Sequence, residues 1–261
     1  MADLSPLLGR TLVLVAHPDD ESVGCGALLQ RMREPMVVFA TDGAPRDDYF
    51  WKTHGSRLRY SRLRQEEARV ALGAVGVNEI EFLPDQARGL EVFVDQELYR
   101  VIPQAMQLLA SLIERRRPQA LLTLAYEGGH PDHDTCNFLF SILGKRYRLP
   151  TWEMPLYFRA DPGDRIFQDF LTRNGTEVEL YPTPDEIAAK HRMLAAYPSQ
   201  SHFLTRFAEN SEHFRPMAAY DYTRPPHEGL LNYESWQWSM TGRDVAAEFA
   251  RYLASAQVQS A

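Results

Sequence analysis

Residues 11–26 read TLVLVAHPDDESVGCG, and the order of residue types in this stretch decides the fold. Leu12 to Val15 is a short continuous run of β-forming residues, typical of a strand that is buried on both faces, as in a parallel sheet. Pro18 disfavours helix at His17 and suits the first turn of a helix that follows. One imidazole and three carboxylates therefore stand where a central strand ends and a helix begins. In open α/β sheets this edge is where ligands bind.

Strand and helix patterns alternate through the first 150 residues. Apolar runs predict further buried strands at 36–40, 79–83 and 119–124, and helical spacing predicts helices at 21–33, 60–75, 95–116 and from the early 130s to about 147. Asp95 is expected to cap the third helix, inside which Pro103 predicts a kink or a later start. The alternation predicts βαβ units with right-handed crossovers, and therefore an α/β protein with a mostly parallel sheet.

Beyond Leu149 the pattern changes. Shorter strands, some of them antiparallel, are expected at 153–158, 164–170 and 176–180, and helical segments at 184–196, 202–207 and about 243–255. Residues 212–239 are aromatic, rich in proline and irregular. No Gly/Ser-rich linker separates the two halves, so we interpret residues 1–261 as a single domain, with a core at about 10–207 and an irregular aromatic C-terminal extension at 208–261.

Composition excludes several classes of protein. The net charge of −7 argues against a nucleic-acid partner, because such binding depends on a clustered excess of Lys and Arg. The chain has only two cysteines, Cys25 and Cys136, which does not indicate a disulfide framework and fits a reducing compartment. The N-terminus lacks a signal-peptide pattern, and no apolar run approaches the ~20 residues that span a bilayer. These observations predict a cytoplasmic protein without a membrane span.

A second strand end repeats the design of the first. The predicted strand at 119–124 is followed by Gly129-His130-Pro131-Asp132-His133-Asp134. His17 and Asp20 lie three residues apart across the first turn, and His133 follows the second strand in the same way. If the two strands are neighbours or near neighbours, these three side chains meet at one edge of the sheet. Three N/O ligands with an open fourth position describe a catalytic zinc site.

The residues beside these ligands suit hydrolysis. Asp19 adjoins Asp20 but points elsewhere, so it is free to act as a general base and then an acid on a water that zinc activates. His130, if protonated, is expected to donate to an oxyanion. Asp132 is placed to orient an imidazole, and Glu21 is expected to act either behind the ligands or as a helix-start carboxylate.

Simpler explanations account for one such turn but not for two. A single His-Pro-Asp turn is most often only a turn in which the aspartate caps the next helix. Two of them, each closing a buried strand, are much harder to explain by capping. A two-metal phosphohydrolase is disfavoured, because such sites usually need more carboxylates than these turns supply.

At these residues the chain resembles the zinc-dependent N-acetylglucosaminyl de-N-acetylases, the PIG-L/LmbE-like superfamily. The motifs that carry the resemblance are Ala16-His17-Pro18-Asp19-Asp20-Glu21 and Gly129-His130-Pro131-Asp132-His133-Asp134, which are specific in this order and about 110 residues apart. Thr41-Asp42-Gly43 and Arg64-Gln65-Glu66-Glu67-Ala68 also fit. The resemblance covers roughly residues 10–145, and a weaker match follows at 190–200, which ends in AYPSQ.

The resemblance implies a Rossmann-like three-layer fold and one zinc ion. It assigns the ion to the positions of His17, Asp20 and His133. It also implies that Asp19 is the general base and that His130 stabilises the tetrahedral intermediate.

The resemblance extends to the substrate. Arg64 and Asp85 match positions that touch the sugar. Some members of the superfamily use a tyrosine two residues before the position of His130. Here that position is Gly128, and the nearest tyrosine is Tyr126.

The predicted function is zinc-dependent removal of an N-acetyl group from an N-acetylglucosamine-type substrate, a small N-acetylated sugar or conjugate. One alternative is an amidase that acts on a larger amide, such as a thiol-sugar conjugate. Another is a non-catalytic binding protein on the same fold, although such a protein would not need Asp19 beside the ligands. The loop at 44–56 and the aromatic C-terminal segment could shape the pocket, and that segment could instead contact a second subunit of a homo-oligomer.

Overall fold

A seven-stranded sheet of order β3-β2-β1-β4-β5-β9-β8 forms the centre of the molecule. In the computed structural model, residues 3–87, 92–160 and 163–259 are described. The parallel strands are β1 (Arg10–Val15), β2 (Glu34–Phe39), β3 (Glu79–Phe82), β4 (Ala120–Leu124) and β5 (Thr151–Met154). The antiparallel strands are β9 (Glu212–Pro216) and β8 (Val178–Leu180).

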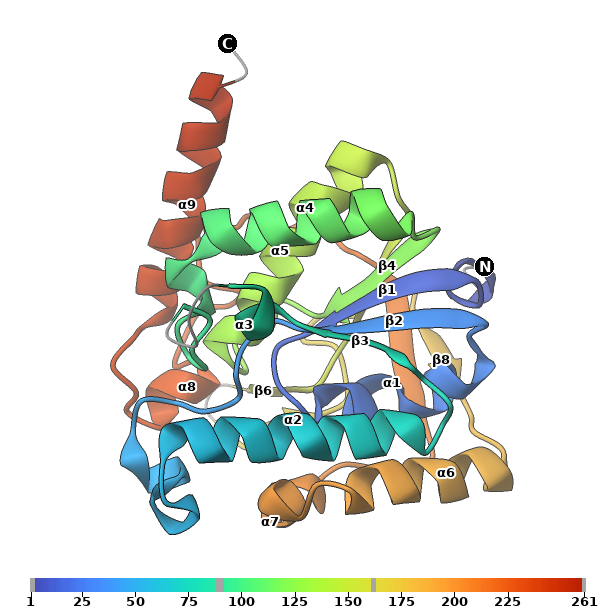
Figure 1. Cartoon of the computed structure of the whole chain (residues 1–261). Helices are drawn as coiled ribbons and strands as arrows, with labels where there is room; N and C mark the ends of the chain where they lie inside the picture. Colours follow the sequence, from blue (N-terminus) through green and yellow to red (C-terminus); the bar gives the residue numbers. More distant parts are fainter. Residues whose placement is uncertain (1–2, 88–91, 161–162, 260–261) are drawn as a thin grey trace.

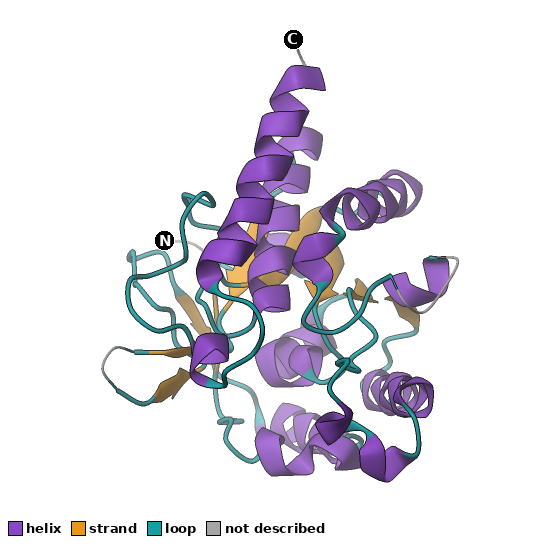
Figure 2. Cartoon of the chain, turned by 90° about the vertical axis from the view of Figure 1, so that its left-hand side faces the viewer, coloured by secondary structure: helices purple, strands orange, loops and turns teal. Residues whose placement is uncertain are grey.

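Helices cover both faces of this sheet, which gives three layers (Figure 1). One face carries α1 (Asp20–Arg31), α2 (Arg57–Gly73) and α6 (Pro184–Ala195), and the other carries α4 (Ile102–Arg116), α5 (Pro131–Tyr147) and α9 (Gly242–Gln259). The short helices are α3 (Leu83–Gln86), α7 (Ser201–Leu204) and α8 (Asn232–Ser235), and a separate hairpin pairs β6 (Tyr157–Arg159) with β7 (Arg165–Phe167). Figure 2 shows the far end of α9 rising clear of the rest of the molecule.

The apolar run at Leu12 to Val15 becomes the buried centre of the sheet. β1 pairs in parallel with β2 on one side and β4 on the other, so that Val13 lies opposite both Val37 and Leu122. All three of these side chains are fully buried. The strands that follow β1 lie on both sides of it, with β2 and β3 on one side and β4 and β5 on the other. This arrangement confirms the predicted α/β, Rossmann-like fold with a mostly parallel sheet. It also confirms that the strands before the two histidine turns are neighbours.

Two predicted elements differ from the structure. The helix expected from Asp95 begins at Ile102, so the later start is what the structure has, with Pro103 in the first turn, where a missing N–H costs nothing. The strand expected at 153–158 is divided into β5 and β6, because Pro155 cannot donate to a ladder and interrupts it.

The expectation of irregular structure at 212–239 is wrong for residues 232–235, which form α8, and for residues 212–216. Residues 212–216 form β9, which lies inside the sheet between β5 and β8. Glu212, the first residue of this strand, is an acidic residue that is buried. The strand therefore does not show the alternation of apolar and polar residues by which strands are predicted. α9 is also anchored, because Phe249 stacks on Phe138 of α5 with ring centroids 4.3 Å apart.

Both cysteines are buried and free. Over the described residues, no helix combines the length and the apolar content needed to cross a membrane.

Candidate active site

The two histidine turns meet at the carboxyl ends of β1 and β4. His17 and Asp19 lie between β1 and α1, and Asp20 is the first residue of α1. His130 lies between β4 and α5, and His133 is in the first turn of α5. Because β1 and β4 are paired, side chains 110 residues apart in sequence come into contact. The strand order of the sheet reverses between β1 and β4. In α/β folds of this kind, ligands usually bind at the carboxyl ends of the strands at this point.

The Asp20 carboxylate lies against both His17 and His133. Asp20 Oδ2 accepts the backbone N–H groups of Ala16 and His17 at 3.1 and 2.8 Å. The other carboxylate oxygen, Asp20 Oδ1, faces His133 Nε2 at 3.3 Å. His17 Nδ1 lies 3.4 Å from Asp20 Oδ2. Each of the three side chains therefore presents an atom that can bind a metal ion.

His133 gives the best test of whether these residues fit a metal ion. The side chain is 1% exposed, its Nδ1 has no hydrogen-bond partner among the described residues, and its Nε2 faces Asp20 Oδ1 at 3.3 Å. A buried polar atom without a partner costs about 1–3 kcal/mol, and such atoms usually mark an ion or water. Donor nitrogens of His17, His130 and His133 also lie within 4.8 Å of one another. The donor set of imidazoles and one carboxylate fits a divalent ion such as zinc.

Asp132 lies behind His17, as the sequence predicts for a carboxylate that orients an imidazole. Its Oδ2 lies 3.3 Å from His17 Nε2, the nitrogen that faces away from Asp20. The same carboxylate accepts the backbone N–H groups of Gln96 and Leu98 at 2.6 and 3.0 Å, which fixes its orientation. A carboxylate on the second nitrogen of a ligand histidine sets the tautomer and ring angle of that histidine.

Asp19 has an unusual backbone conformation, with a φ of 116° in a region that side chains with a Cβ rarely adopt. Its N–H donates to Glu21 Oε2 at 3.1 Å, and Tyr197 Oη donates to Glu21 Oε1 at 2.7 Å. On the other side, Arg64 Nη2 donates to Asp19 Oδ2 at 3.2 Å and to the Pro18 carbonyl. Glu21, predicted to act behind the ligands, thus holds the backbone of Asp19.

Burial raises the pKa of Asp19 to about 8, with Asp20 adding to the rise and Arg64 opposing it. A carboxyl group with a pKa near neutrality can both accept and return a proton, which is what a general base that later acts as an acid requires. Asp19 is buried beside the cluster, and its geometry suits this role.

His130 differs in one respect from the expectation. Its Nδ1 accepts the backbone N–H of Asp132 at 3.1 Å, so the proton of the neutral ring lies on Nε2. Burial and the neighbouring His17 lower the pKa of His130 to about 4. Burial beside a second histidine therefore favours a neutral imidazole over the expected protonated donor, and its Nε2 lies 3.4 Å from Asp95 Oδ1.

The three residues predicted to bind substrate lie in different surroundings. Arg64 is buried beside the cluster, and its Nη1 also donates to the Gly43 carbonyl at 2.7 Å. Asp85 is half-exposed on α3, within 3.4 Å of Gln65. Tyr126 is buried and donates its hydroxyl to the Arg224 carbonyl at 2.7 Å, in the C-terminal segment. Of these three residues, only Arg64 has a contact with Asp19 among the described residues.

Glycine is required in the second turn. Gly128 has a φ of +72°, and a Cβ there would lie 2.8 Å from a methyl group of Leu231. A Cβ at Gly129 would lie 1.9 Å from the Tyr157 carbonyl oxygen. A tyrosine at position 128 therefore does not fit this backbone, and Gly129 lets the turn pass against β6.

Two further residues lie in the cluster that sequence reasoning missed. Asp95 Oδ1 lies 3.1 Å from His17 Nε2 and 3.4 Å from His130 Nε2, although Asp95 was expected to cap a helix. Burial opposes its ionisation, yet the two histidines hold its pKa below the ordinary range. The Tyr157 ring packs edge-on against His133 with centroids 5.4 Å apart. The only sequence signal for Asp95 was an acid directly after the apolar Phe93-Val94.

Comparison with known proteins identifies the family of the chain. The sequence model of the PIG-L family, described as GlcNAc-PI de-N-acetylase, matches residues 12–142. The chain is 27% identical over 219 residues to the 1D-myo-inositol 2-acetamido-2-deoxy-alpha-D-glucopyranoside deacetylase of Mycobacterium sp. (strain KMS), with 71% of this chain and 69% of that protein covered. It is 29% identical over 177 residues to the probable N-acetyl-alpha-D-glucosaminyl L-malate deacetylase 2 of Bacillus subtilis (strain 168), with 65% and 71% covered.

Solved structures share the fold. A triple mutant of a deacetylase from the teicoplanin biosynthetic pathway superposes with a TM-score of 0.61. The two sequences are 17% identical, and the superposition covers 79% of this chain and 97% of that one.

Proposed function

This chain belongs to the PIG-L family and is a hydrolytic N-deacetylase, and from that premise we propose that it removes the acetyl group of an N-acetylglucosamine-type substrate with the aid of one bound zinc ion. The products are acetate and the free amine. The proposal assigns the ion to His17, Asp20 and His133, the general base to Asp19 and the oxyanion donor to His130.

The convergence of the two turns carries the proposal. The imidazoles of His17 and His133 both lie against the Asp20 carboxylate, and Nδ1 of the buried His133 has no hydrogen-bond partner among the described residues. Asp19 lies beside these side chains with its backbone fixed by Glu21. A binding protein would gain nothing from an aspartate held in a strained conformation there.

Each side chain of the site has its own role in the proposed reaction. Asp19 takes a proton from the attacking water and passes it to the departing amine nitrogen, so the amide C–N bond is replaced by a C–O bond without any other reactant. His130 Nε2–H donates to the carbonyl oxygen as negative charge develops on it. Asp132 keeps the His17 ring in one orientation. When bound, a zinc ion supplies Lewis-acid activation of the water and the carbonyl group.

Asp19→Asn and His133→Ala test the division of roles. The zinc-loaded chain is incubated with a panel of N-acetylated sugars and their conjugates, and the new primary amine is measured. Asp19→Asn is expected to keep its zinc and to lose about 10²–10⁴-fold in kcat, because a general base contributes about that much. His133→Ala is expected to lose zinc as well as activity.

His191→Ala is the matched control, because the His191 side chain is 59% exposed on α6. It should keep both zinc and activity. Loss of zinc from Asp19→Asn would contradict the separate roles of the two aspartates, and absence of amine across the whole panel would contradict the proposed function.

A further inference from the structure

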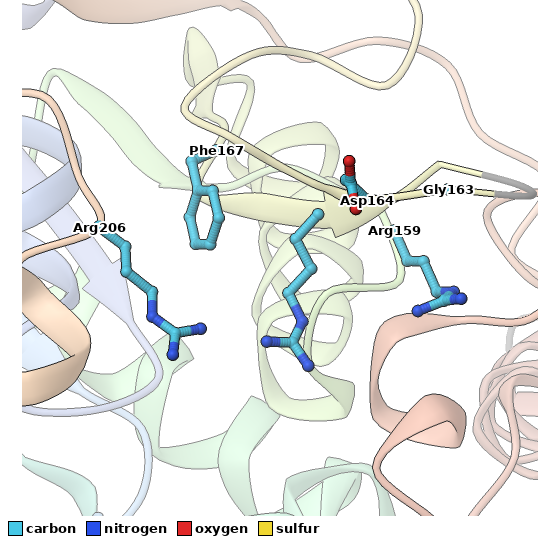
Figure 3. Close-up of a pocket in the computed structure, with 6 residues that line it drawn as sticks. Arg159, Gly163, Asp164, Phe167 and Arg206 are labelled. Carbon is cyan, nitrogen blue, oxygen red and sulfur yellow. The ribbon is translucent and has the colours of Figure 1, made fainter.

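Three arginines gather at the hairpin formed by β6 and β7. A cavity of about 440 Å³ is lined by Arg159, Gly163, Asp164, Arg165, Phe167 and Arg206. Figure 3 shows Arg206 and Arg159 on opposite sides of the group of residues that line this cavity. The protein as a whole carries a net charge of −7, so this cluster is a local reversal of sign. The lining has three guanidinium groups and one carboxylate, Asp164, so positive charge is in excess. An excess of one sign of charge at a concave site attracts ligands of the opposite sign.

The arrangement costs stability in the absence of a ligand. Arg159 and Arg165 lie directly opposite each other in the antiparallel register of the hairpin. Like charges at directly opposed positions of two strands destabilise the pair. Burial lowers the pKa of Arg165, and the charges of Arg206 and Arg159 lower it further, while Tyr157 opposes them. An anion in the cavity would remove this repulsion.

The side-chain contacts of Arg165 and Arg206 are with neutral groups. Arg165 Nε donates to Asn232 Oδ1 at 2.7 Å, and its guanidinium group stacks 4.6 Å from the Trp236 ring. The Arg206 guanidinium group lies 5.7 Å from the Phe203 ring. None of these partners neutralises a guanidinium charge.

Short contacts link the cavity to the proposed active site. Asn232, which accepts from Arg165, donates its side-chain N–H to the Gly129 carbonyl at 2.9 Å, one residue before His130. Along a second route, Trp236 packs on Trp238 at 4.9 Å, and Trp238 packs on the His130 ring at 5.0 Å. These contacts connect the hairpin that forms the cavity with the turn that carries His130.

We propose that the cavity binds an anionic oxygen group, phosphoryl or carboxylate, at the end of the substrate distant from the acetamide. This inference rests on the proposed function and adds the class of substrate: an N-acetylated sugar that carries an acidic group. Guanidinium groups suit this ligand, because their planar donors bind carboxylate and phosphate oxygens in pairs.

The test is a comparison of substrates with the double variant Arg159→Gln and Arg206→Gln. Arg165 is left intact because it supports Asn232. Three N-acetylglucosamine conjugates of similar size are used, with a phosphodiester, a carboxylate and a neutral group. We expect the variant to raise KM for the acidic conjugates about 10–100-fold, since hydrogen bonds to charged groups contribute about 1.5–3 kcal/mol. The kinetic constants for the neutral conjugate should stay within about twofold.

The matched control is Arg251→Gln, which removes an exposed positive charge from α9. An equal loss on neutral and acidic conjugates would overturn the proposal, because it would mean that the arginines only support the fold. An unchanged KM for the acidic conjugates would also overturn it. A preference for either acidic conjugate supports it and identifies the group that is bound.

A binding measurement separates this proposal from the proposed function. Inorganic phosphate is titrated calorimetrically into the full chain after removal of metal, at constant ionic strength. Phosphate binding by the wild-type chain and its loss in the double variant would support the cavity even if no conjugate were hydrolysed. Absence of phosphate binding by the wild-type chain would overturn the cavity and leave the deacetylase proposal intact.

Discussion

At the scale of single residues, the position of Asp19 depends on a side chain that is remote in sequence. Tyr197 donates to Glu21, and Glu21 accepts the backbone N–H of Asp19, the residue with a φ of 116°. Tyr197 belongs to the AYPSQ segment, whose resemblance to the family is weaker than that of the two histidine turns. These two hydrogen bonds explain in physical terms why the AYPSQ segment occurs together with the first histidine turn.

Tyr197→Phe removes one hydrogen bond from this chain and keeps the ring. We expect kcat to fall about tenfold, because a hydrogen bond to a charged group contributes about 1.5–3 kcal/mol and its loss frees Glu21 to move. KM and zinc content should change little, since the tyrosine contacts neither substrate nor metal. Tyr181→Phe, at a tyrosine that is 67% exposed, is the control. An unchanged kcat in Tyr197→Phe would show that Asp19 keeps its position without this support.

The sequence allowed the residues of the two turns to be predicted as a cluster, but not Asp95 or Tyr157. His17, Asp20 and His133 follow apolar strands directly, so the geometry of strand ends brings them together. Asp95 lies in an irregular connection, where its N–H donates to Asp42 Oδ1 at 3.2 Å. Such a position depends on tertiary contacts that no local pattern encodes.

At the scale of elements, Glu212 of β9 supports α1 from within the sheet. α1 is interrupted at Cys25, whose φ of −144° is not helical. The N–H groups of Ala27 and Leu28 donate to the two carboxylate oxygens of Glu212 at 2.7 and 2.9 Å. Lys190 Nζ, also fully buried, donates to the same carboxylate at 2.7 Å. A strand late in the chain thus completes the helix that begins at Asp20.

Glu212→Ala is expected to lower the free energy of unfolding by about 3–5 kcal/mol, because it leaves the Lys190 charge buried without its partner. Urea denaturation followed by circular dichroism measures the change. Glu179→Ala on the adjacent β8 is the matched control, with a side chain that is 44% exposed, and should cost about 0–1 kcal/mol. Equal effects of the two changes would contradict the role given to Glu212.

The strand β9 also shows which kind of secondary-structure element could not be predicted from the sequence. β1, β2 and β4 are continuous apolar runs and were predicted to within about two residues at each end. β9 contains Glu212, His213 and Arg215, and its place in the sheet depends on charged pairs such as Arg215 with Glu153 at 2.7 Å. Periodicity measures apolar burial, so a strand held by buried charges escapes it.

At the scale of the whole molecule, buried carboxyl groups make the stability of the metal-free chain depend on pH. Burial raises the pKa of both Asp19 and Asp134 to about 8. Between pH 6.5 and 8 the folded chain therefore binds protons at these positions that the unfolded chain has already released. Stability falls as pH rises wherever the folded state binds more protons.

We expect the Tm of the metal-free chain to fall from pH 6.5 to 8.5, measured by differential scanning calorimetry. Asp134→Asn should make this fall smaller, because Asn keeps the oxygen that accepts from Glu127 and Gly128 and does not titrate. Asp48→Asn, at an exposed aspartate in the loop after β2, is the control and should leave the slope unchanged. A Tm that rises over this interval would contradict the protonated state of the buried aspartates.

The division of the proposed ligands between β1 and β4 also bears on how the chain folds. On the proposed set, His17 and Asp20 lie at one end of a segment of more than 100 residues, and His133 lies at the other. A metal ion can be held by all three only after the long-range pairing of β1 with β4, which is the slow class of contact in folding. Zinc then acts as a removable cross-link across this segment, and its binding free energy adds to that of the closed sheet. Metal uptake during refolding would therefore report the moment at which the two halves of the sheet join.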